Sequence, residues 1–430
     1  MQTASPHIPK IVRIVVFCAY LASWLLFCWQ SADVRFSNTD DVAFETAARS
    51  GRAEQYLIDN AESQARFYFA TPIYRHLLLS PYCIESPLIF SVVRGLLLYA
   101  QAGLLGWLAA RLWGNAPLGA AIAFLIVSTL HIPATFYPVL SYFAMSAGFV
   151  ALLLALHCYL SWLRRGSPFT GALAAVSFLF ACASLELFAV FLPAFAFLAW
   201  IERGPNWSRA LRALFVPTVI VVLYLAAYAM FAREFPSSYP GTQIKLDLAA
   251  ASGVLFRQLV GVIPGFEMLV QRLPEGHSGP VFRPLGDILA DFTVGMELCI
   301  GVAHGFITAW LILAAWRERS RMITLDWPVL ISLGIWANLP LLVSAKYHTF
   351  IFQRQFPYIY AFYSFCLFAW ALTAFIVWLA DNTPRLRSVL ASLVCISIGV
   401  LCVSAQLSNT RTFAALKSKY GEMGRQSPSP

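Results

Sequence analysis

Long apolar runs separated by shorter polar segments make up most of the chain. Eleven of these runs are candidates for membrane-crossing helices, each of which needs about 20 mostly apolar residues. The runs cover residues 11–30, 88–110, 118–134, 139–162, 169–185, 187–201, 213–231, 296–316, 327–345, 359–380 and 388–406. Runs five and six are short and nearly contiguous, so they predict a helical hairpin that turns near Glu186. The pattern predicts an all-α polytopic membrane protein of about 11 transmembrane helices.

Two long polar segments interrupt this pattern, at residues 31–87 and 232–295, and a shorter one covers residues 346–358. Long loops in a compact protein are usually functional. The first and second segments are predicted to be loops of a single integral membrane domain over residues 1–430. Within the second segment, residues 244–260 predict an amphipathic helix. The Ser- and Pro-rich end, 423–430, is predicted to be a short flexible tail.

The composition excludes several classes of protein. Hydrophobic residues make up 59% of the chain and charged residues 12%, whereas a soluble globular chain has about 25% charged residues. A soluble enzyme, a disordered chain and a coiled coil are therefore excluded. Of the nine cysteines, Cys83 alone lies in a polar loop, which leaves no disulfide or zinc pattern. Lys10 and Arg13 precede the first run, and no small-residue cleavage site follows it, so we predict an uncleaved first span.

The distribution of charge predicts an orientation. The formal net charge is +9, which in a soluble protein would suggest a nucleic-acid partner. With a cytoplasmic N-terminus, the inner segments hold 13 basic and four acidic residues, and the rest of the chain holds 17 of each. This is the positive-inside pattern. It predicts a C-terminus outside, all three polar loops on the outer face, and no nucleic-acid partner.

The first outer loop contains two adjacent carboxylates, Asp40 and Asp41. Like charges this close raise one of the two pKa values, which suits a general base. The alternative is a helix N-terminus, where Thr39 or Asp40 caps the first turn. Further along, Thr71-Pro72 is typical of a helix start, and the following residues predict an amphipathic juxtamembrane helix that carries Arg75. A lid packed on the bundle would show the same pattern.

Several other charged residues are candidate ligands. Lys346, His348 and Arg354 lie among aromatic residues at a predicted membrane boundary. Lysine and arginine there can hold a lipid phosphate through charge-assisted hydrogen bonds, or they can simply snorkel beside an aromatic belt. Arg94 lies inside a predicted span and therefore needs a partner. Glu186, with no cation nearby in sequence, is predicted either to pair with such an arginine or to bind an acceptor.

The chain resembles the GT-C-type glycosyltransferases, integral membrane enzymes that use polyprenyl-phosphate-linked sugars. The layout carries the resemblance: a first span, an outer loop with an acidic pair, a juxtamembrane helix and a many-span bundle. Four short segments add to it, namely Asn38-Thr39-Asp40-Asp41, Gln64-Ala65-Arg66-Phe67, Ser184-Leu185-Glu186 and Tyr239-Pro240-Gly241-Thr242. They look similar to bacterial members that modify lipopolysaccharide O-antigen or other cell-envelope glycans. The chain departs from the oligosaccharyltransferases, because it has no soluble C-terminal domain and no WWD-like signature.

The resemblance implies a reaction and a set of site residues. Asp40 or Asp41 would deprotonate an acceptor hydroxyl, which attacks the sugar of the lipid-linked donor. Arg66, Arg75, Lys346, His348 and Arg354 would bind the donor phosphate, while Glu186 and Arg94 would have acceptor-binding or structural roles. The partners would be a polyprenyl-phosphate sugar, a glycan or lipid-linked acceptor, and membrane lipids. No metal site or cofactor is indicated.

Other functions remain open at this point. A lipid or solute transporter would be expected to show inverted repeats and midplane charges, and neither is evident. An O-antigen polymerase or ligase would carry its chemistry in the loop 232–295, and a membrane scaffold would not need the acidic pair. The sequon Asn206-Trp207-Ser208 lies in a predicted inner loop. This favours a bacterial inner membrane, with the active site facing the periplasm.

Overall fold

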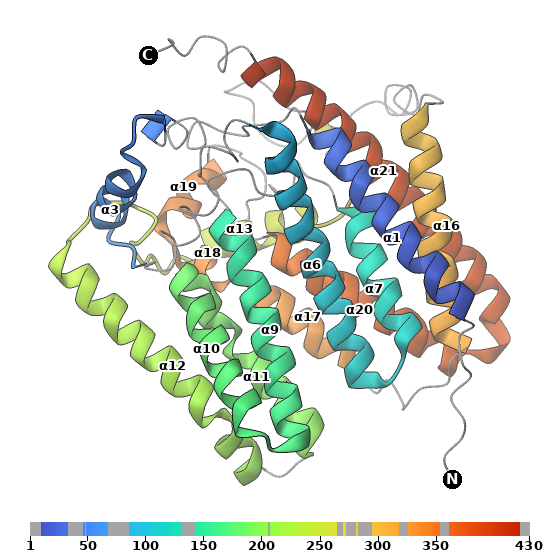
Figure 1. The fold of residues 1–430 in the computed structure, drawn as a ribbon, viewed down its shortest axis with the longest axis horizontal. Helices are drawn as coiled ribbons and strands as arrows, with labels where there is room; N and C mark the ends of the chain where they lie inside the picture. The colour runs from blue at the N-terminus through green and yellow to red at the C-terminus, as the bar shows by residue number, and fades with distance from the viewer. Residues whose placement is uncertain are drawn as a thin grey trace.

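The computed structural model describes eleven stretches of the chain: residues 10–32, 46–47, 49–67, 86–130, 143–204, 207–264, 270–271, 281–282, 295–317, 326–352 and 361–421. Within them the protein is an all-α polytopic membrane protein (Figure 1). Seven helices are long and apolar enough to cross a membrane. They are α1 (Lys10–Ser31), α6 (Pro87–Trp113), α9 (Phe143–Arg165), α12 (Trp207–Glu234), α16 (Met296–Arg317), α20 (Ala361–Asn382) and α21 (Arg387–Gly421).

Shorter elements complete the described fold. The helices are α3 (Ala53–Ser63), α7 (Ala116–Thr129), α10 (Pro168–Ser184), α11 (Leu192–Arg203), α13 (Leu248–Gly261), α17 (Asp326–Trp336), α18 (Leu339–Val343) and α19 (Ala345–Phe352). Two 3-10 helices, η2 (Glu186–Phe191) and η3 (Pro384–Leu386), join longer helices. Strands β1 (Val270–Gln271) and β2 (Val281–Phe282) form one small antiparallel pair, with Val270 opposite Phe282.

Each of the eleven predicted spans falls on helical structure, but four of them are divided or short. Span three corresponds to α7 and span five to α10, with 14 and 17 residues. Span six consists of η2 followed by α11, and span nine of α17 followed by α18. An α-helix rises 1.5 Å per residue, so 14 residues cover about 21 Å of a hydrocarbon core about 30 Å thick. The multi-pass character is confirmed, whereas the count of eleven crossings stays a prediction.

The interruption of span nine has a local cause. Pro340 is the second residue of α18 and cannot donate the backbone hydrogen bond that would continue α17. The side-chain amide of Asn338 instead donates to the Gly334 carbonyl at 3.0 Å and to Ser364 Oγ at 2.8 Å. A helix break at membrane depth is tolerated when neighbouring groups satisfy the freed polar atoms. Asn338 therefore holds the corner between α17 and α18 against α20.

Small residues set the closest approach of helices in the core. A Cβ atom built on Gly106 of α6 would lie 2.2 Å from the carbonyl oxygen of Gly119 in α7, and one on Gly119 would lie 2.4 Å from the Gly106 carbonyl. Glycines at such crossings let two backbones pack directly, as is common between membrane helices. This contact places α7 inside the bundle, where its side chains are mostly buried.

Substitution of Gly106 by alanine is expected to destabilise the protein, because the added methyl group overlaps the α7 backbone. Overpacking of this kind costs about 1–3 kcal/mol. Gly103 is a matched control in the same helix, since the nearest atom to its built Cβ is Tyr20 Oη at 3.7 Å. The measurement is the thermal denaturation midpoint in detergent. Gly106→Ala should lower the midpoint and Gly103→Ala should not, and equal midpoints for the two variants would contradict this account of the crossing.

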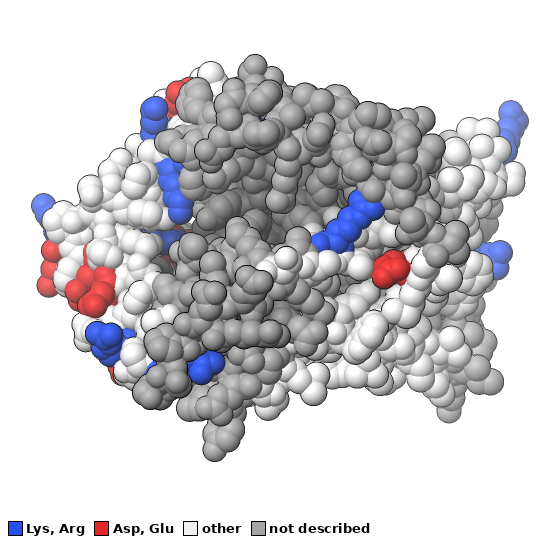
Figure 2. Space-filling view, turned by 90° about the horizontal axis from the view of Figure 1, so that it is seen from above, with Lys and Arg blue, Asp and Glu red and all other residues white. Residues whose placement is uncertain are grey.

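The two ends of the bundle differ. Figure 1 shows the N-terminus at one end and the C-terminus at the other, with α3, α13 and α19 gathered at the C-terminal end, called here the upper end. Figure 2 looks onto this end and shows side chains of both charges on its described surface, many of them on the side of α3 and the end of α12. The exposed charges there include Arg52, Glu54, Asp59, Arg233 and Glu234. The described charged residues of α3 and of the end of α12 thus share one end with the residues discussed next.

Candidate functional site

An ion pair joins two segments that are 120 residues apart. Arg66 lies just after α3, where Ala65 adopts a left-handed backbone angle (φ 52°) that turns the chain toward the bundle. Glu186 begins η2, directly after α10. Arg66 donates to Glu186 Oε1 from Nε at 2.9 Å and from Nη2 at 2.5 Å. The side chains are 18% and 26% exposed, so the contact lies at the edge of the packed bundle.

The second carboxylate oxygen of Glu186 differs from the first in its contacts. Glu186 Oε2 is buried and accepts no hydrogen bond within the described part of the chain. Buried polar atoms are normally paired, so an unpaired carboxylate oxygen beside a solvent-accessible ion pair is notable. Such an atom can accept a hydrogen bond from a ligand hydroxyl. Arg66 thus fixes one oxygen of Glu186 and leaves the other for a donor group.

The segment that carries Arg66 is anchored to α12. The Tyr224 hydroxyl donates to the Phe67 carbonyl at 2.8 Å. The Phe67 ring also contacts Phe231, about two helix turns further along α12, with ring centroids 5.4 Å apart. The hydrogen bond to the Phe67 carbonyl and the contacts of the Phe67 ring together fix the position of residues 64–67 along α12. Arg66 is therefore held in place by its neighbours and not only by its own ion pair.

A second polar group is built on the segment Tyr239-Pro240-Gly241-Thr242. The chain after it runs extended and pairs with the corner between α18 and α19. The Lys245 N–H donates to the Val343 carbonyl at 2.7 Å, and the Ala345 N–H donates to the Gln243 carbonyl at 2.9 Å. Ser344 Oγ also donates to the Gly241 carbonyl at 3.1 Å. This short backbone ladder fixes the segment against the first residues of α19.

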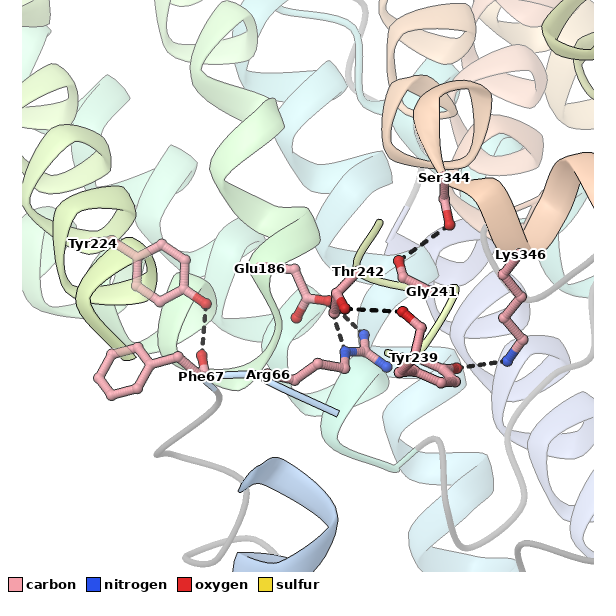
Figure 3. Close-up of polar contacts among 9 residues, drawn as sticks. All are labelled: Arg66, Phe67, Glu186, Tyr224, Tyr239, Gly241, Thr242, Ser344 and Lys346. Atoms are coloured by element: carbon pink, nitrogen blue, oxygen red, sulfur yellow. Dashed lines mark hydrogen bonds and ion pairs between the residues drawn. The ribbon is translucent and has the colours of Figure 1, made fainter. Parts of the chain in front are cut away.

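Lys346 of α19 points at the Tyr239 side chain (Figure 3). Its Nζ donates to the Tyr239 hydroxyl at 2.7 Å and lies 5.1 Å from the ring centroid. Its backbone N–H donates to the Pro240 carbonyl at 3.0 Å. A lysine ammonium can make three hydrogen bonds, and the contact with Tyr239 fixes the direction of one of them.

A hydrogen bond links the segment that precedes Arg66 to the segment that precedes Tyr239. Ser237 Oγ donates to the Ser63 carbonyl at the end of α3. The chain before Tyr239 therefore contacts the chain before Arg66. We call Arg66, Glu186, Tyr239 and Lys346 the polar cluster (Figure 3). Three of the four short segments singled out from the sequence contribute to it, and it contains two of the predicted phosphate ligands, Arg66 and Lys346.

The pairing of Arg66 was missed at the level of sequence. Glu186 is predicted there either to pair with an intramembrane arginine or to bind an acceptor, and in the structure it pairs with Arg66, which follows α3. Arg94 instead lies buried in α6, donates from Nη2 to the Ser31 carbonyl at 2.9 Å and lies over the Phe90 ring. In the sequence, Glu186 lies alone between two apolar runs. This position indicates that the carboxylate needs a partner or a function, but it does not identify the partner.

The remaining predicted residues have different surroundings. His348 is 1% exposed, and its Nε2 contacts the Leu342 carbonyl at 2.8 Å. Because a carbonyl can only accept, Nε2 carries the proton and fastens α19 to α18. Asp40, Asp41, Arg75 and Arg354, and the amphipathic helix expected to begin at Thr71, lie outside the described residues. Their predicted roles are not tested.

The start of α13 also differs from expectation. The sequence predicts an amphipathic helix over residues 244–260, but the helix begins at Leu248. Residues 244 and 245 pair with the α18–α19 corner instead. Asp247 caps the helix by accepting from the Ala250 N–H at 3.1 Å, and this hydrogen bond lowers the pKa of the Asp247 carboxyl. The backbone ladder outcompetes the first helical turn.

Comparison of the chain with protein-family models, with curated proteins and with solved structures gives no match. Within the described ranges, no three His, Cys, Asp or Glu side chains gather into a group that would hold a metal ion. The geometry of the polar cluster is therefore the basis for a functional proposal.

Proposed function

We propose that this protein is a GT-C-type membrane glycosyltransferase that moves a sugar from a polyprenyl-phosphate donor to a cell-envelope glycan or lipid-linked acceptor. One observation carries the proposal. Segments 64–67, 184–186 and 239–242, which resemble such enzymes, lie together at one end of the bundle beside Lys346. These segments are far apart in the sequence, and only the tertiary fold brings them together. Their proximity supports a shared site.

The chemistry requires a base, a cation for the phosphate and a group that orients the acceptor. Asp40 or Asp41 is proposed as the base that takes the proton of the acceptor hydroxyl. The hydroxyl oxygen bonds to the anomeric carbon as the bond from that carbon to the phosphate oxygen breaks. The lipid phosphate leaves with its electron pair, and direct displacement inverts the anomeric configuration. Lys346 is placed to stabilise the negative charge of the leaving phosphate through charge-assisted hydrogen bonds.

Glu186 is the proposed acceptor-orienting group. Its unpaired Oε2 is suited to accept a hydrogen bond from a sugar hydroxyl, while Arg66 fixes Oε1 at 2.5 Å and 2.9 Å. Fixing a reacting group in advance removes part of the entropic cost of reaching the transition state. Arg75 and Arg354 stay in the proposal as further phosphate ligands. His348, whose ring proton is donated to the Leu342 carbonyl, instead holds α19 against α18, and Arg94 is a structural residue of the bundle.

The direct test is a transfer assay. Purified protein in lipid nanodiscs is incubated with a set of radiolabelled polyprenyl-phosphate sugars and with delipidated and lipid-linked cell-envelope glycans as acceptors. The proposal expects label to move from the lipid to the glycan with at least one donor, and the product to have inverted anomeric configuration. Donor hydrolysis without transfer, or labelled lipid that crosses the bilayer unchanged, would contradict it and favour a transporter.

The proposed location is a bacterial inner membrane, with eleven crossings and the polar cluster on the periplasmic side. Basic residues at the opposite end of the bundle, including Arg111, Arg164, Arg165, Arg203 and Arg317, support this orientation. Reporter fusions check it. A reporter that is active only in the periplasm should be inactive after Gly166 and active after Gly421, and the reverse pattern would contradict the orientation.

A further inference from the structure

A cluster of polar side chains lies at the opposite end of the bundle from the polar cluster. Arg111, in the last turn of α6, crosses to α9. Its Nη1 donates to His157 Nδ1 and to the His157 carbonyl, both at 3.0 Å, and its Nη2 donates to Ser161 Oγ at 2.8 Å. None of these acceptors is charged. A half-buried guanidinium is thus positioned by neutral groups, so its positive charge is not neutralised by them.

The partner histidine is held in one protonation state. An arginine can only donate, so His157 Nδ1 accepts and carries no proton. His157 Nε2 then donates to the Leu104 carbonyl at 2.8 Å. The Trp107 ring stacks on the imidazole with centroids 4.3 Å apart, and the guanidinium carbon of Arg111 lies 5.5 Å from the Trp107 ring centroid. These contacts fix the direction of Arg111 before any ligand arrives.

Further cations surround this arginine. Arg164 and Arg165, in the last turn of α9, act electrostatically on Arg111, and Glu202 of α11 is the carboxylate that does so. Arg164 already binds Glu202 Oε1 at 2.5 Å and 3.0 Å. Glu202 is therefore already bound by Arg164, and it acts on Arg111 only through space. Cations near helix C-termini complement the helix dipoles, but that effect does not require two of them close to a prepositioned guanidinium.

Apolar surface adjoins the cations on the membrane side. Trp107 is 56% exposed and Leu154, one turn before His157, is 41% exposed. Both lie on helices long enough to cross a membrane, so acyl chains cover them. Tryptophan near a cation at a helix end is typical of the headgroup level of a bilayer. The surface between α6 and α9 thus has an apolar part for acyl chains and a cationic part for a headgroup.

We propose that Arg111, with Arg164 and Arg165, forms a binding site for the phosphate of an anionic phospholipid. Arginine suits a phosphate because its planar fork donates two parallel hydrogen bonds. Basic pockets between transmembrane helices bind anionic lipid headgroups in the same way. The occupant is a lipid of the bilayer, because the cations adjoin lipid-covered surface. The site is independent of the proposed enzymatic function.

The test measures lipid preference directly. Full-length protein in detergent is mixed with equal amounts of phosphatidylglycerol and phosphatidylcholine that have identical acyl chains, and retained lipids are counted by native mass spectrometry. Wild type should retain phosphatidylglycerol preferentially. Arg111→Gln should reduce that preference by roughly fivefold, because one basic residue near an anionic lipid contributes about 1 kcal/mol.

The controls separate lipid binding from folding and from general charge. Arg212→Gln removes an exposed cation at the same end of the bundle and should keep the preference. Arg165→Gln removes an exposed cation beside Arg111 and should lower the preference even if Arg111→Gln fails to fold. Equal retention of the two lipids by wild type, or an unchanged preference in both Arg111→Gln and Arg165→Gln, would overturn the proposal.

Discussion

Replacement of Asp40 or Asp41 by asparagine is expected to abolish sugar transfer from a polyprenyl-phosphate donor. Asparagine keeps the size of the side chain but cannot take a proton from the acceptor hydroxyl. General-base catalysis contributes a factor of about 10² to 10⁴ to the rate. The transfer rate of at least one of the two variants should therefore fall by this factor. The measurement is the initial rate of label transfer at saturating donor, using protein shown to insert and fold.

The control for this experiment lies in the same loop. Asp59 of α3 is exposed and accepts a hydrogen bond from Gln55 Nε2 at 2.7 Å. Asp59→Asn makes the same chemical change away from the acidic pair and should leave the rate unchanged. If Asp40→Asn and Asp41→Asn both transfer sugar at the wild-type rate, neither carboxylate is the base, and the acidic pair is better explained as a helix N-terminus.

Glu186→Gln is expected to reduce transfer by roughly ten- to hundredfold. The change removes the charge that pairs with Arg66 and weakens the oxygen proposed to receive the acceptor hydroxyl. Hydrogen bonds to charged groups contribute about 1.5–3 kcal/mol, which corresponds to this range. Because the proposed role is in orienting the acceptor, we expect the KM for the acceptor to rise and the KM for the donor to change little.

A second ion pair of nearly identical geometry provides the matched control. Arg164 binds Glu202 Oε1 at 2.5 Å and 3.0 Å at the other end of the bundle. Glu202→Gln should leave transfer unchanged. If Glu202→Gln and Glu186→Gln lower the rate equally, the loss reflects stability and not a site. Arg66→Gln combined with Glu186→Gln should be less damaging than the sum of the two single changes, because the residues share one contact.

The pattern of apolar residues was sufficient to predict the helices. Every predicted span falls on helical structure, because apolar runs in a membrane must satisfy their backbone hydrogen bonds internally. The ends of the helices, and the breaks within them, were less predictable from the sequence. The corner at Asn338 depends on Ser364, 26 residues away, and the late start of α13 depends on Val343. Local propensity carries no information about such distant partners.

The candidate site was partly predictable for a related reason. Glu186 and Lys346 were singled out as charged residues at the ends of apolar runs, where an ionisable group is costly without a function or a partner. Arg66 was singled out through the resemblance of residues 64–67 to GT-C-type enzymes. The sequence did not indicate which residues these charged side chains would bind. Glu186 pairs with Arg66 and not with Arg94, and Lys346 binds Tyr239, which lies more than a hundred residues earlier in the chain.

The sequence by itself determined the class of protein and the rough limits of its apolar helices, whereas the number of crossings and their orientation stay predictions. These properties follow from the transfer of individual side chains and backbone groups into lipid, which depends on local composition. Only the tertiary structure decided that Arg66 fixes Glu186, that Tyr239 orients Lys346, and that Arg111 rests on a neutral His157. These contacts depend on which helices pack together, and small residues such as Gly106 and Gly119 determine that packing.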